Sequence, residues 1–388
     1  MNTQNSVANI LKIIKEFITE ARIEKALTIA NLVTVILSGS KISLYQLGIA
    51  TNCNHSKLKS CEQRIRRLLD QFPITAVIYA KAVLLLFNFS SSVELIIDRT
   101  NWMFGRTDIN YLVLSLRWND CLAIPIYWMM LDNKGGNSNS EQRIALVEWF
   151  ITSFKHLEII NIYADREFPS VKFITWLLKN NINFIFRSKG SINASAGDKK
   201  VSLSKLYHGL ANAIHNSKIE RKISRIFGNR LYISARINNA SEFMFLVSNQ
   251  HHDDPFTLYA RRWNIETMFG NFKTKSFDLE STHITQYHRL SALFMILAIT
   301  YCFSCKMGYI ANKIKPIKQK KLKDQNGNIV FRPEFTIFKY GFYLLKNFFN
   351  NFLSYSAVVA KQLYKILCYH FSPNYHRRSR IIQIILGF

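Results

Sequence analysis

The sequence has 388 residues, of which 48% are hydrophobic and 13% aromatic, a composition that excludes an intrinsically disordered chain. Its 51 Lys and Arg residues outnumber its 25 Asp and Glu residues, so the formal net charge is +26. An excess of this size predicts a polyanionic partner, for which nucleic acid is the first candidate and a membrane surface the second.

The N-terminal segment, residues 1–75, is predicted to be helical because apolar residues recur at steps of three and four. Within it, SLYQLGIATNCNHSKLKSCEQRIRRLLD indicates a short helix, a turn at Asn52–Asn54 and a basic helix with Arg64, Arg66 and Arg67. This order is similar to a helix-turn-helix that binds DNA. A plain helical bundle with a solvated basic face explains the same pattern.

Residues 93–190 alternate between strand-like and helix-like patterns. Strands are expected near 93–98, 110–117, 121–131, 157–164 and 183–187, and helices near 140–155 and 169–181. The dipeptide Asn119-Asp120 is a turn signal, so the second and third strands are predicted to form a hairpin. Three strands, a helix, a strand, a helix and a strand indicate an α/β unit.

Two of these strands are predicted to end at an aspartate. The apolar run in VELIIDRTNW leads to Asp98, and the run in LEIINIYADREF leads to Asp165. Open α/β sheets place their chemistry at strand ends, which favours a functional role for both carboxylates. A single aspartate at such a place is also common as a turn or cap residue.

Residues 190–250 interrupt the alternation. Two strand-like runs, NRLYISARIN and EFMFLVSN, follow a basic stretch between Lys218 and Arg225. This segment is therefore expected to be rich in strands.

Four polar residues in LYARRWNIETMFGNFKTKSFDLE have the spacing of a single helix face. Tyr259, Arg262, Glu266 and Lys273 fall within a stripe about 60° wide at 100° per residue. A neighbouring apolar face would bury the helix through Ile265, Met268, Phe269 and Phe272. The carboxylate in this stripe can hold a metal ion and the cations can hold phosphates. A solvated face with weak ion pairs has the same spacing.

The C-terminal third contains an apolar stretch, a basic run and an aromatic segment. Leu290–Ser304 has no charged residue but is shorter than the ~20 residues that span a bilayer, so it predicts a core helix and a cytoplasmic protein. The run from Lys313 to Lys323 is typical of a flexible solvated linker and could also follow DNA phosphates. The segment TIFKYGFYLLKNFFNNFLSYSAVV is expected to be helical.

The chain resembles the DDE transposases of the bacterial insertion sequence 4 family. The Y-x2-R-x3-E-x6-K signature of that family is matched without a gap by Tyr259, Arg262, Glu266 and Lys273. DRTNW resembles its first acidic motif and DREF its second, and the Leu-Glu-x-Thr-His stretch at 279–283 is also similar. The resemblance runs from about residue 93 to 305.

The resemblance implies a ribonuclease H-like catalytic core with a β-rich insertion, flanked by helical N- and C-terminal domains. The expected segments are a DNA-binding domain at 1–75, the core at 90–190 and 251–310, the insertion at 191–250, and a C-terminal region with possible dimer contacts at 311–388.

The resemblance also implies a two-metal site. Asp98 would bridge two Mg²⁺ ions, for which Mn²⁺ could substitute, while Asp165 and Glu266 would each hold one ion. The residues expected to contact DNA are Tyr259, Arg262, Lys273, Arg99 and Arg166.

The implied activity is cleavage at the terminal inverted repeats of an insertion sequence and joining of the 3′-OH ends to target DNA. A homodimer would assemble on the DNA, in the bacterial cytoplasm at the nucleoid, with no membrane partner. Two alternatives stay open from the sequence. One is an inactive DNA-binding regulator derived from a transposase, and the other is a metal-dependent nuclease without strand transfer.

Overall fold

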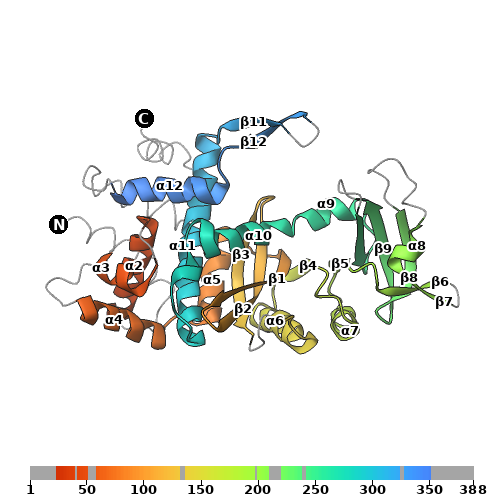
Figure 1. The fold of residues 1–388 in the computed structure, drawn as a ribbon, viewed down its shortest axis with the longest axis horizontal. Coiled ribbons are helices and arrows are strands. Elements are labelled where there is room, and N and C mark those ends of the chain that lie inside the picture. The colour runs from red at the N-terminus through yellow and green to blue at the C-terminus, as the bar shows by residue number, and fades with distance from the viewer. Residues whose placement is uncertain are drawn as a thin grey trace. The chain divides into compact units, whose positions relative to one another are not determined.

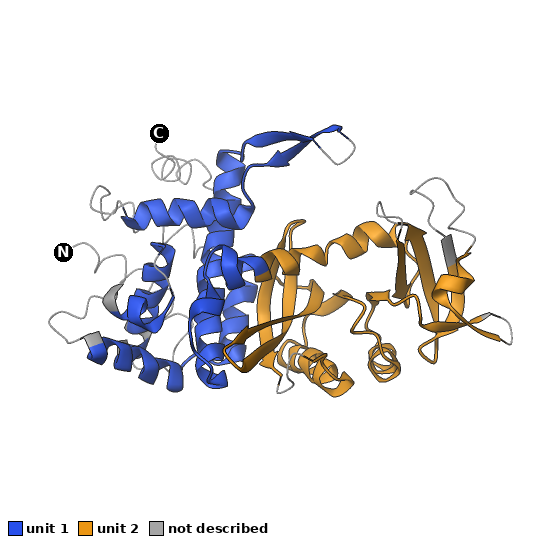
Figure 2. Cartoon of the chain, viewed as in Figure 1, with its two compact units in different colours: residues 1–88, 270–388 blue, residues 89–269 orange. Residues whose placement is uncertain are grey.

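The computed structural model combines helices with a large mixed sheet (Figure 1). It describes residues 23–39, 42–50, 58–131, 136–196, 199–208, 220–237, 242–323 and 327–350. The chain divides into two compact units, one formed by Met1–Asn88 with Gly270–Phe388 and the other by Phe89–Phe269 (Figure 2). The unit formed by Phe89–Phe269 is called the sheet unit below, and the other the helical unit.

The sheet unit is built on a sheet of ten strands in the order β3-β2-β1-β4-β5-β10-β9-β8-β6-β7. Its first five strands in chain order are β1 (Ser92–Phe104), β2 (Thr107–Trp118), β3 (Leu122–Met130), β4 (Glu158–Ala164) and β5 (Phe184–Ser188). The first three pair antiparallel, while β4 pairs parallel with both β1 and β5. These strands confirm the predicted alternation and the hairpin at Asn119, which has a left-handed φ of 52°.

Apolar burial explains why β1 lies in the middle of these five strands. Leu95, Ile96 and Ile97 are fully buried, as expected for a strand covered on both faces. Two helices pack beside the strands, α6 (Ser140–Ser153) and α7 (Val171–Lys179), and they lie next to each other in Figure 1. Each begins at a side-chain cap, Asn139 for α6 and Ser170 for α7.

The predicted strand-rich segment extends the same sheet. It contains β6 (Asn193–Ala196), β7 (Lys199–Ser202), α8 (Leu203–Leu206), β8 (Glu220–Ile226), β9 (Asn229–Ile237) and β10 (Phe243–Ser248). The antiparallel pairing of β10 with β5 joins these strands to the first five. Two short helices, α9 (Pro255–Ala260) and α10 (Trp263–Gly270), then carry Tyr259 and Glu266, with Arg262 in the turn between them.

The helical unit contains both ends of the described chain. Its N-terminal helices are α2 (Ile23–Leu37), α3 (Leu44–Ala50), α4 (Leu58–Asp70) and α5 (Ala76–Phe87). The predicted turn at Asn52–Asn54 lies outside the described residues, so the helix-turn-helix stays a prediction. After α10 the chain forms the π-helical turn η2 (Asn271–Lys275) and the short helix η3 (Leu279–Ser281). The rest of the unit is α11 (Tyr287–Ile314), β11 (Gln319–Lys323), β12 (Ile329–Pro333) and α12 (Ile337–Asn350).

Helix α11 is longer than the apolar stretch that predicted it. Its 28 residues meet the length and hydropathy of a membrane-spanning helix, but 89% of its most apolar window is buried within the protein. Burial of this kind is typical of the core helix of a folded domain. The prediction of a core helix is therefore confirmed, with longer bounds.

The basic run at 313–323 is not the flexible linker that its composition predicted. Its last part forms β11, which pairs antiparallel with β12 in a two-stranded sheet. The pairing needs the β-prone residues Ile329, Val330 and Phe331, which lie beyond the basic run.

Candidate active site

Strand register places the two aspartates side by side. The parallel pairing of β1 with β4 ends at Ile97 opposite Ala164, and the next residues are Asp98 and Asp165. The prediction that Asp98 ends its strand was wrong, because β1 continues to Phe104 as the partner of β2. Asp98 instead marks the point at which β1 leaves β4. The two carboxylates therefore lie where the parallel pairing opens.

The turn between α9 and α10 returns Glu266 to this point. Arg261 forms an ion pair of 2.7 Å with Glu94 of β1, and Arg262 forms one of 2.9 Å with Asp98. Arg262 also bridges to Glu266, four residues later on α10. Helix α10 packs its apolar face inward, since Ile265 and Met268 are fully buried. Three elements thus bring Asp98, Asp165 and Glu266 into one unit.

The prediction of a single continuous α-helix across the signature was wrong. The backbone N–H groups of Arg261 and Arg262 bond to the carbonyls three residues earlier, so the chain tightens and α9 ends before α10 begins. The apolar face was predicted correctly, because Phe269 and Phe272 are buried along with Ile265 and Met268.

Tyr259 contacts the second aspartate. Its hydroxyl donates a hydrogen bond of 3.1 Å to Asp165 Oδ1, and the side chain is 4% exposed. The guanidinium of Arg262 lies 5.5 Å from the centre of the Tyr259 ring, within range of a cation–π interaction. Arg187 of β5 approaches the same Asp165 oxygen to 3.8 Å. Tyr259 and Arg262 therefore contact the aspartates directly.

Electrostatics link the three carboxylates. Burial raises the pKa of Asp98 to about 7, although the Arg262 guanidinium and the backbone N–H of Arg99 favour its charged form. The negative charges of Asp165 and Glu266 raise the Asp98 pKa further. A partly buried cluster of like charges favours the binding of a cation.

The three carboxylates are donors of the type that a hard divalent cation prefers. Carboxylate oxygens are the ligands that Mg²⁺ and Mn²⁺ prefer, and the three side chains come from neighbouring elements. Among the described residues, however, no three His, Cys, Asp or Glu side chains lie close enough together to hold one ion. The guanidinium of Arg262 lies between Asp98 and Glu266 and supplies the positive charge in this arrangement.

Comparison with protein families gives one match in this region. Residues 125–303 match the family model Transposase DDE domain. The matched part of the DDE domain begins within β3 and contains Asp165, Glu266 and Lys273, whereas Asp98 precedes it. The DDE domain supports a transposase function, and proteins with this domain generally use divalent metals. A search of curated proteins gave no match.

The three remaining predicted DNA contacts differ in their surroundings. Arg166 is exposed directly after Asp165. Lys273 lies in η2 and forms an ion pair of 3.0 Å with Glu280, both within the helical unit. Arg99 is only partly exposed and is engaged by protein groups. Contact of these three residues with DNA stays a prediction.

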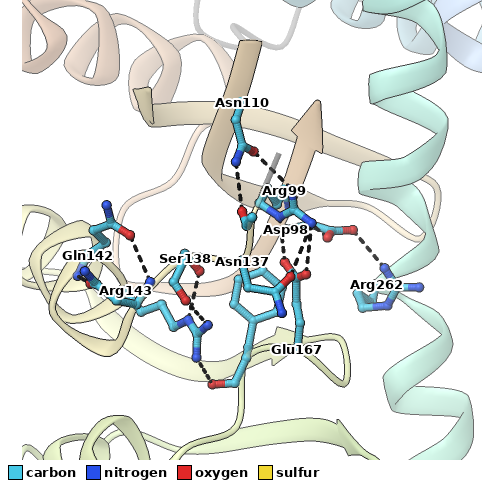
Figure 3. A network of polar contacts seen from close by, with 12 residues as sticks. Asp98, Arg99, Asn110, Asn137, Ser138, Gln142, Arg143, Glu167 and Arg262 are labelled. Carbon is cyan, nitrogen blue, oxygen red and sulfur yellow. Dashed lines mark hydrogen bonds and ion pairs between the residues drawn. The ribbon is translucent and has the colours of Figure 1, made fainter. Parts of the chain in front are cut away.

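Arg99 of β1 and Glu167 of the turn after β4 form a clamp beside the two aspartates. Nε and Nη2 of Arg99 each lie 3.2 Å from a carboxylate oxygen of Glu167, and Arg99 Nη1 donates to Asn110 Oδ1 at 3.2 Å (Figure 3). Arg99 follows Asp98 directly, and Glu167 lies two residues after Asp165. We therefore infer that the clamp sets the separation of the two aspartates.

A second contact holds the turn formed by the DREF residues, 165–168. Buried Arg143 of α6 donates to the carbonyl of Phe168 at 2.7 Å and to Ser138 (Figure 3). The backbone N–H of Phe168 in turn bonds to the Asp165 carbonyl at 3.0 Å.

Sequence reasoning missed Glu167, Arg143, Glu94 and Arg261. For Glu94 a signal existed, because residues four apart on a strand share a face and Asp98 lies on β1 four residues later.

If the two aspartates hold metal ions for DNA cleavage, as proposed below, Glu167→Gln should lower cleavage by about ten- to a hundredfold, the size of effect of residues that orient metal ligands. The Mg²⁺ concentration for half-maximal cleavage should rise as well, which a purely structural role would not cause. Combining Arg99→Glu with Glu167→Arg should restore part of the loss. Glu141→Gln is the matched control, since Glu141 pairs with Lys172 on the exposed surface of the same unit. An unchanged Mg²⁺ requirement in Glu167→Gln would contradict the positioning role.

Proposed function

We propose that this chain is a cut-and-paste transposase of the insertion sequence 4 type. It would cleave at the terminal inverted repeats of its own element and join the freed 3′-OH ends to target DNA. The observation that carries this proposal is that Arg262 bridges Asp98 and Glu266 while strand register sets Asp165 beside Asp98, together with the match of residues 125–303 to a transposase DDE domain.

Strand topology supports a ribonuclease H-like core for this site. The order β3-β2-β1-β4-β5, with three antiparallel strands followed by parallel pairing, has the chain order expected for that fold. We assign the core to 90–190 and 251–310, and β6 to β10 to the insertion at 191–250. Residues 1–75 would form the DNA-binding domain and 311–388 the region of dimer contacts.

The side chains divide into ligands and phosphate contacts. Asp98, Asp165 and Glu266 would hold two divalent ions, which when bound activate the attacking oxygen and stabilise charge on the phosphate. Arg262 presents a planar fork suited to a phosphate, so a DNA phosphate can replace its carboxylate partners. Tyr259 would orient Asp165 through its hydrogen bond. Lys273, Arg99 and Arg166 are proposed as further phosphate contacts.

Two assembly properties accompany the proposal. Coordinated cutting of two element ends needs two active sites, so we propose a homodimer on DNA, which light scattering of the protein–DNA complex would measure. A complex in which one protein chain holds two ends would rule the dimer out.

We place the protein at the nucleoid of the bacterial cytoplasm. Fluorescence of a tagged chain would then coincide with a DNA stain, and a signal at the cell envelope would contradict this location.

The decisive experiment offers labelled terminal-repeat DNA to the purified protein with Mg²⁺, Mn²⁺, Ca²⁺ or a chelator. We expect nicking with Mg²⁺ or Mn²⁺, strand joining when target DNA is added, and no cleavage after metal removal. Protein that binds the ends but never nicks them would identify a regulator. Nicking without joining would identify a nuclease.

A further inference from the structure

The β11–β12 hairpin carries a concentration of positive charge in the helical unit. Every side chain of β11 is exposed, and in β12 only Val330 is partly covered. The cations of the hairpin and its flanks are Lys318, Lys320, Lys321, Lys323 and Arg332. The acidic residues over the same stretch are Asp324 and Glu334.

Register assigns these side chains to two faces. Residues paired across an antiparallel ladder share a face, so Lys321 with Phe331 and Lys323 with Ile329 lie on the same one. Phe331 is 66% exposed and Ile329 is 53% exposed. This face therefore presents two lysines beside two uncovered apolar side chains.

The opposite face bears charge that opposes folding of the hairpin. Lys320 is paired directly with Arg332 across the strands, and like charges at such positions destabilise a hairpin. The ion pair of Lys320 with Glu334 at 3.2 Å offsets this repulsion in part. A two-stranded hairpin is only marginally stable by itself. Cations kept at positions where they destabilise the hairpin indicate that this surface binds a polyanion.

We propose that the β11–β12 hairpin is a DNA-contacting ribbon that lies against a duplex, with its cations on phosphates and Phe331 against the groove. This inference rests on the proposed function, because it takes duplex DNA as the partner. Five paired residues make a ribbon roughly 17 Å long, which suits the major groove, and that groove admits a two-stranded ribbon. Contacts to phosphates carry no sequence preference, so the hairpin would bind target DNA as readily as element ends.

Two other occupants fit less well. A second copy of this hairpin would bring like charges together, and repulsion disfavours such pairing. An anionic membrane surface would satisfy both the charge and the apolar side chains. The transposase DDE domain favours DNA over a membrane.

The test compares the full chain with the triple variant Lys321→Gln, Lys323→Gln, Arg332→Gln. Binding to a random-sequence duplex would be measured by fluorescence anisotropy between about 50 and 200 mM salt. We expect affinity to fall at least about tenfold and the slope of log affinity against log salt to fall by about two to three. The matched control is Lys81→Gln, Lys155→Gln, Lys179→Gln, which removes the same charge from exposed helical or loop positions and should leave the slope nearly unchanged.

A second variant separates apolar contact from charge. Phe331→Ala should lower the affinity for DNA by about tenfold without changing the salt slope. The aromatic ring would become buried against the DNA, and this apolar contribution does not depend on the release of counterions. Both variants should keep the circular dichroism spectrum of the parent, since their side chains are exposed.

The outcomes distinguish the hairpin from the proposed function. If the parent protein binds duplex DNA and the triple variant matches it in affinity and slope, the hairpin assignment alone fails. A parent protein that binds no duplex DNA would overturn the proposed function and the hairpin with it. Loss of binding to phosphatidylserine vesicles with DNA binding intact would assign the hairpin to membranes and overturn the inference.

Discussion

Asp98→Asn, Asp165→Asn and Glu266→Gln should each lower the rate of DNA cleavage by at least about a thousandfold. Each change keeps the size of the side chain but removes a negative charge, so divalent ions are no longer held productively. Loss of their charge stabilisation costs several kcal/mol in the transition state. Arg262 should keep a partner in each variant, because it pairs with both Asp98 and Glu266.

Folding and DNA binding should survive these changes. Burial raises the pKa of Asp98 to about 7, so burying its charged form opposes folding, and Asn keeps the size of the side chain without that charge. The measurement is nicking of labelled terminal-repeat DNA in Mg²⁺, beside a gel shift in Ca²⁺. Glu148→Gln and Glu158→Gln are matched controls, since both remove one charge from exposed positions of the same unit. Near-normal nicking by any of the three site variants would show that the triad is misassigned.

The central strands and both aspartates could be predicted from local pattern. The runs before Asp98 and Asp165 are apolar and β-prone, and the parallel register then places the two residues together. The end of β1 could not be predicted in the same way. Beyond Asp98 the apolar run stops and burial only alternates, with Thr100 and Trp102 buried and Asn101 and Met103 exposed, and pairing with β2 extends the strand.

The position of Glu266 depends on contacts that no local pattern reveals. Arg261 and Arg262 pair with Glu94 and Asp98, which lie 167 and 164 residues away in the chain. These contacts follow from folding of the whole unit around the strands. The helical spacing of the signature is compatible with the Arg262–Glu266 pair but did not predict it. The same spacing wrongly predicted one continuous helix, whereas the chain forms a tight turn at Arg261 and Arg262 between α9 and α10.

Arg99 shows that adjacency in the sequence does not reveal long-range partners. Its place after Asp98 predicts a phosphate contact, which stays a prediction, and did not reveal that its guanidinium pairs with Glu167, 68 residues away. A partly buried arginine requires a partner, and the sequence does not name one. The hairpin at 319–333 was missed for a related reason. The basic run alone indicates a solvated segment, because nothing in it reveals the strand with which it pairs. That strand lies beyond the turn at Gly327, a residue with a left-handed φ of 79°.

A different kind of close contact holds α11 against α12 in the helical unit. Gly308 of α11 and Gly341 of α12 face each other at the crossing that Figure 1 shows. A Cβ atom at Gly341 would lie 1.9 Å from the Ser304 carbonyl oxygen and 2.4 Å from the Gly308 nitrogen. Both obstacles are backbone atoms, so no side-chain rotation relieves them. The two glycines therefore permit direct contact between the helix backbones.

Gly341→Ala should lower the free energy of unfolding of the helical unit by about 3 kcal/mol, at the upper end for an overpacked core. The helices must separate, which loosens the packing of Phe338, Phe342 and Leu345 at the crossing. Helix propensity alone predicts the opposite sign, because alanine is favoured over glycine by about 1 kcal/mol in a helix. Gly308→Ala should behave similarly, since its Cβ would lie 1.9 Å from the Ile337 carbonyl oxygen.

Scanning calorimetry would measure the effect, with a fall in the melting temperature of roughly 6 °C or more expected for either variant. The control is Gly48→Ala in α3 of the same unit, where a Cβ would meet Glu62 at an ordinary 3.5 Å and the helix should gain stability. The double variant Gly308→Ala, Gly341→Ala should lose less than the two single losses combined, because one separation of the helices relieves both clashes. If Gly341→Ala melted at or above the temperature of Gly48→Ala, helix propensity would outweigh the clash, and α11 and α12 would not be held by backbone contact.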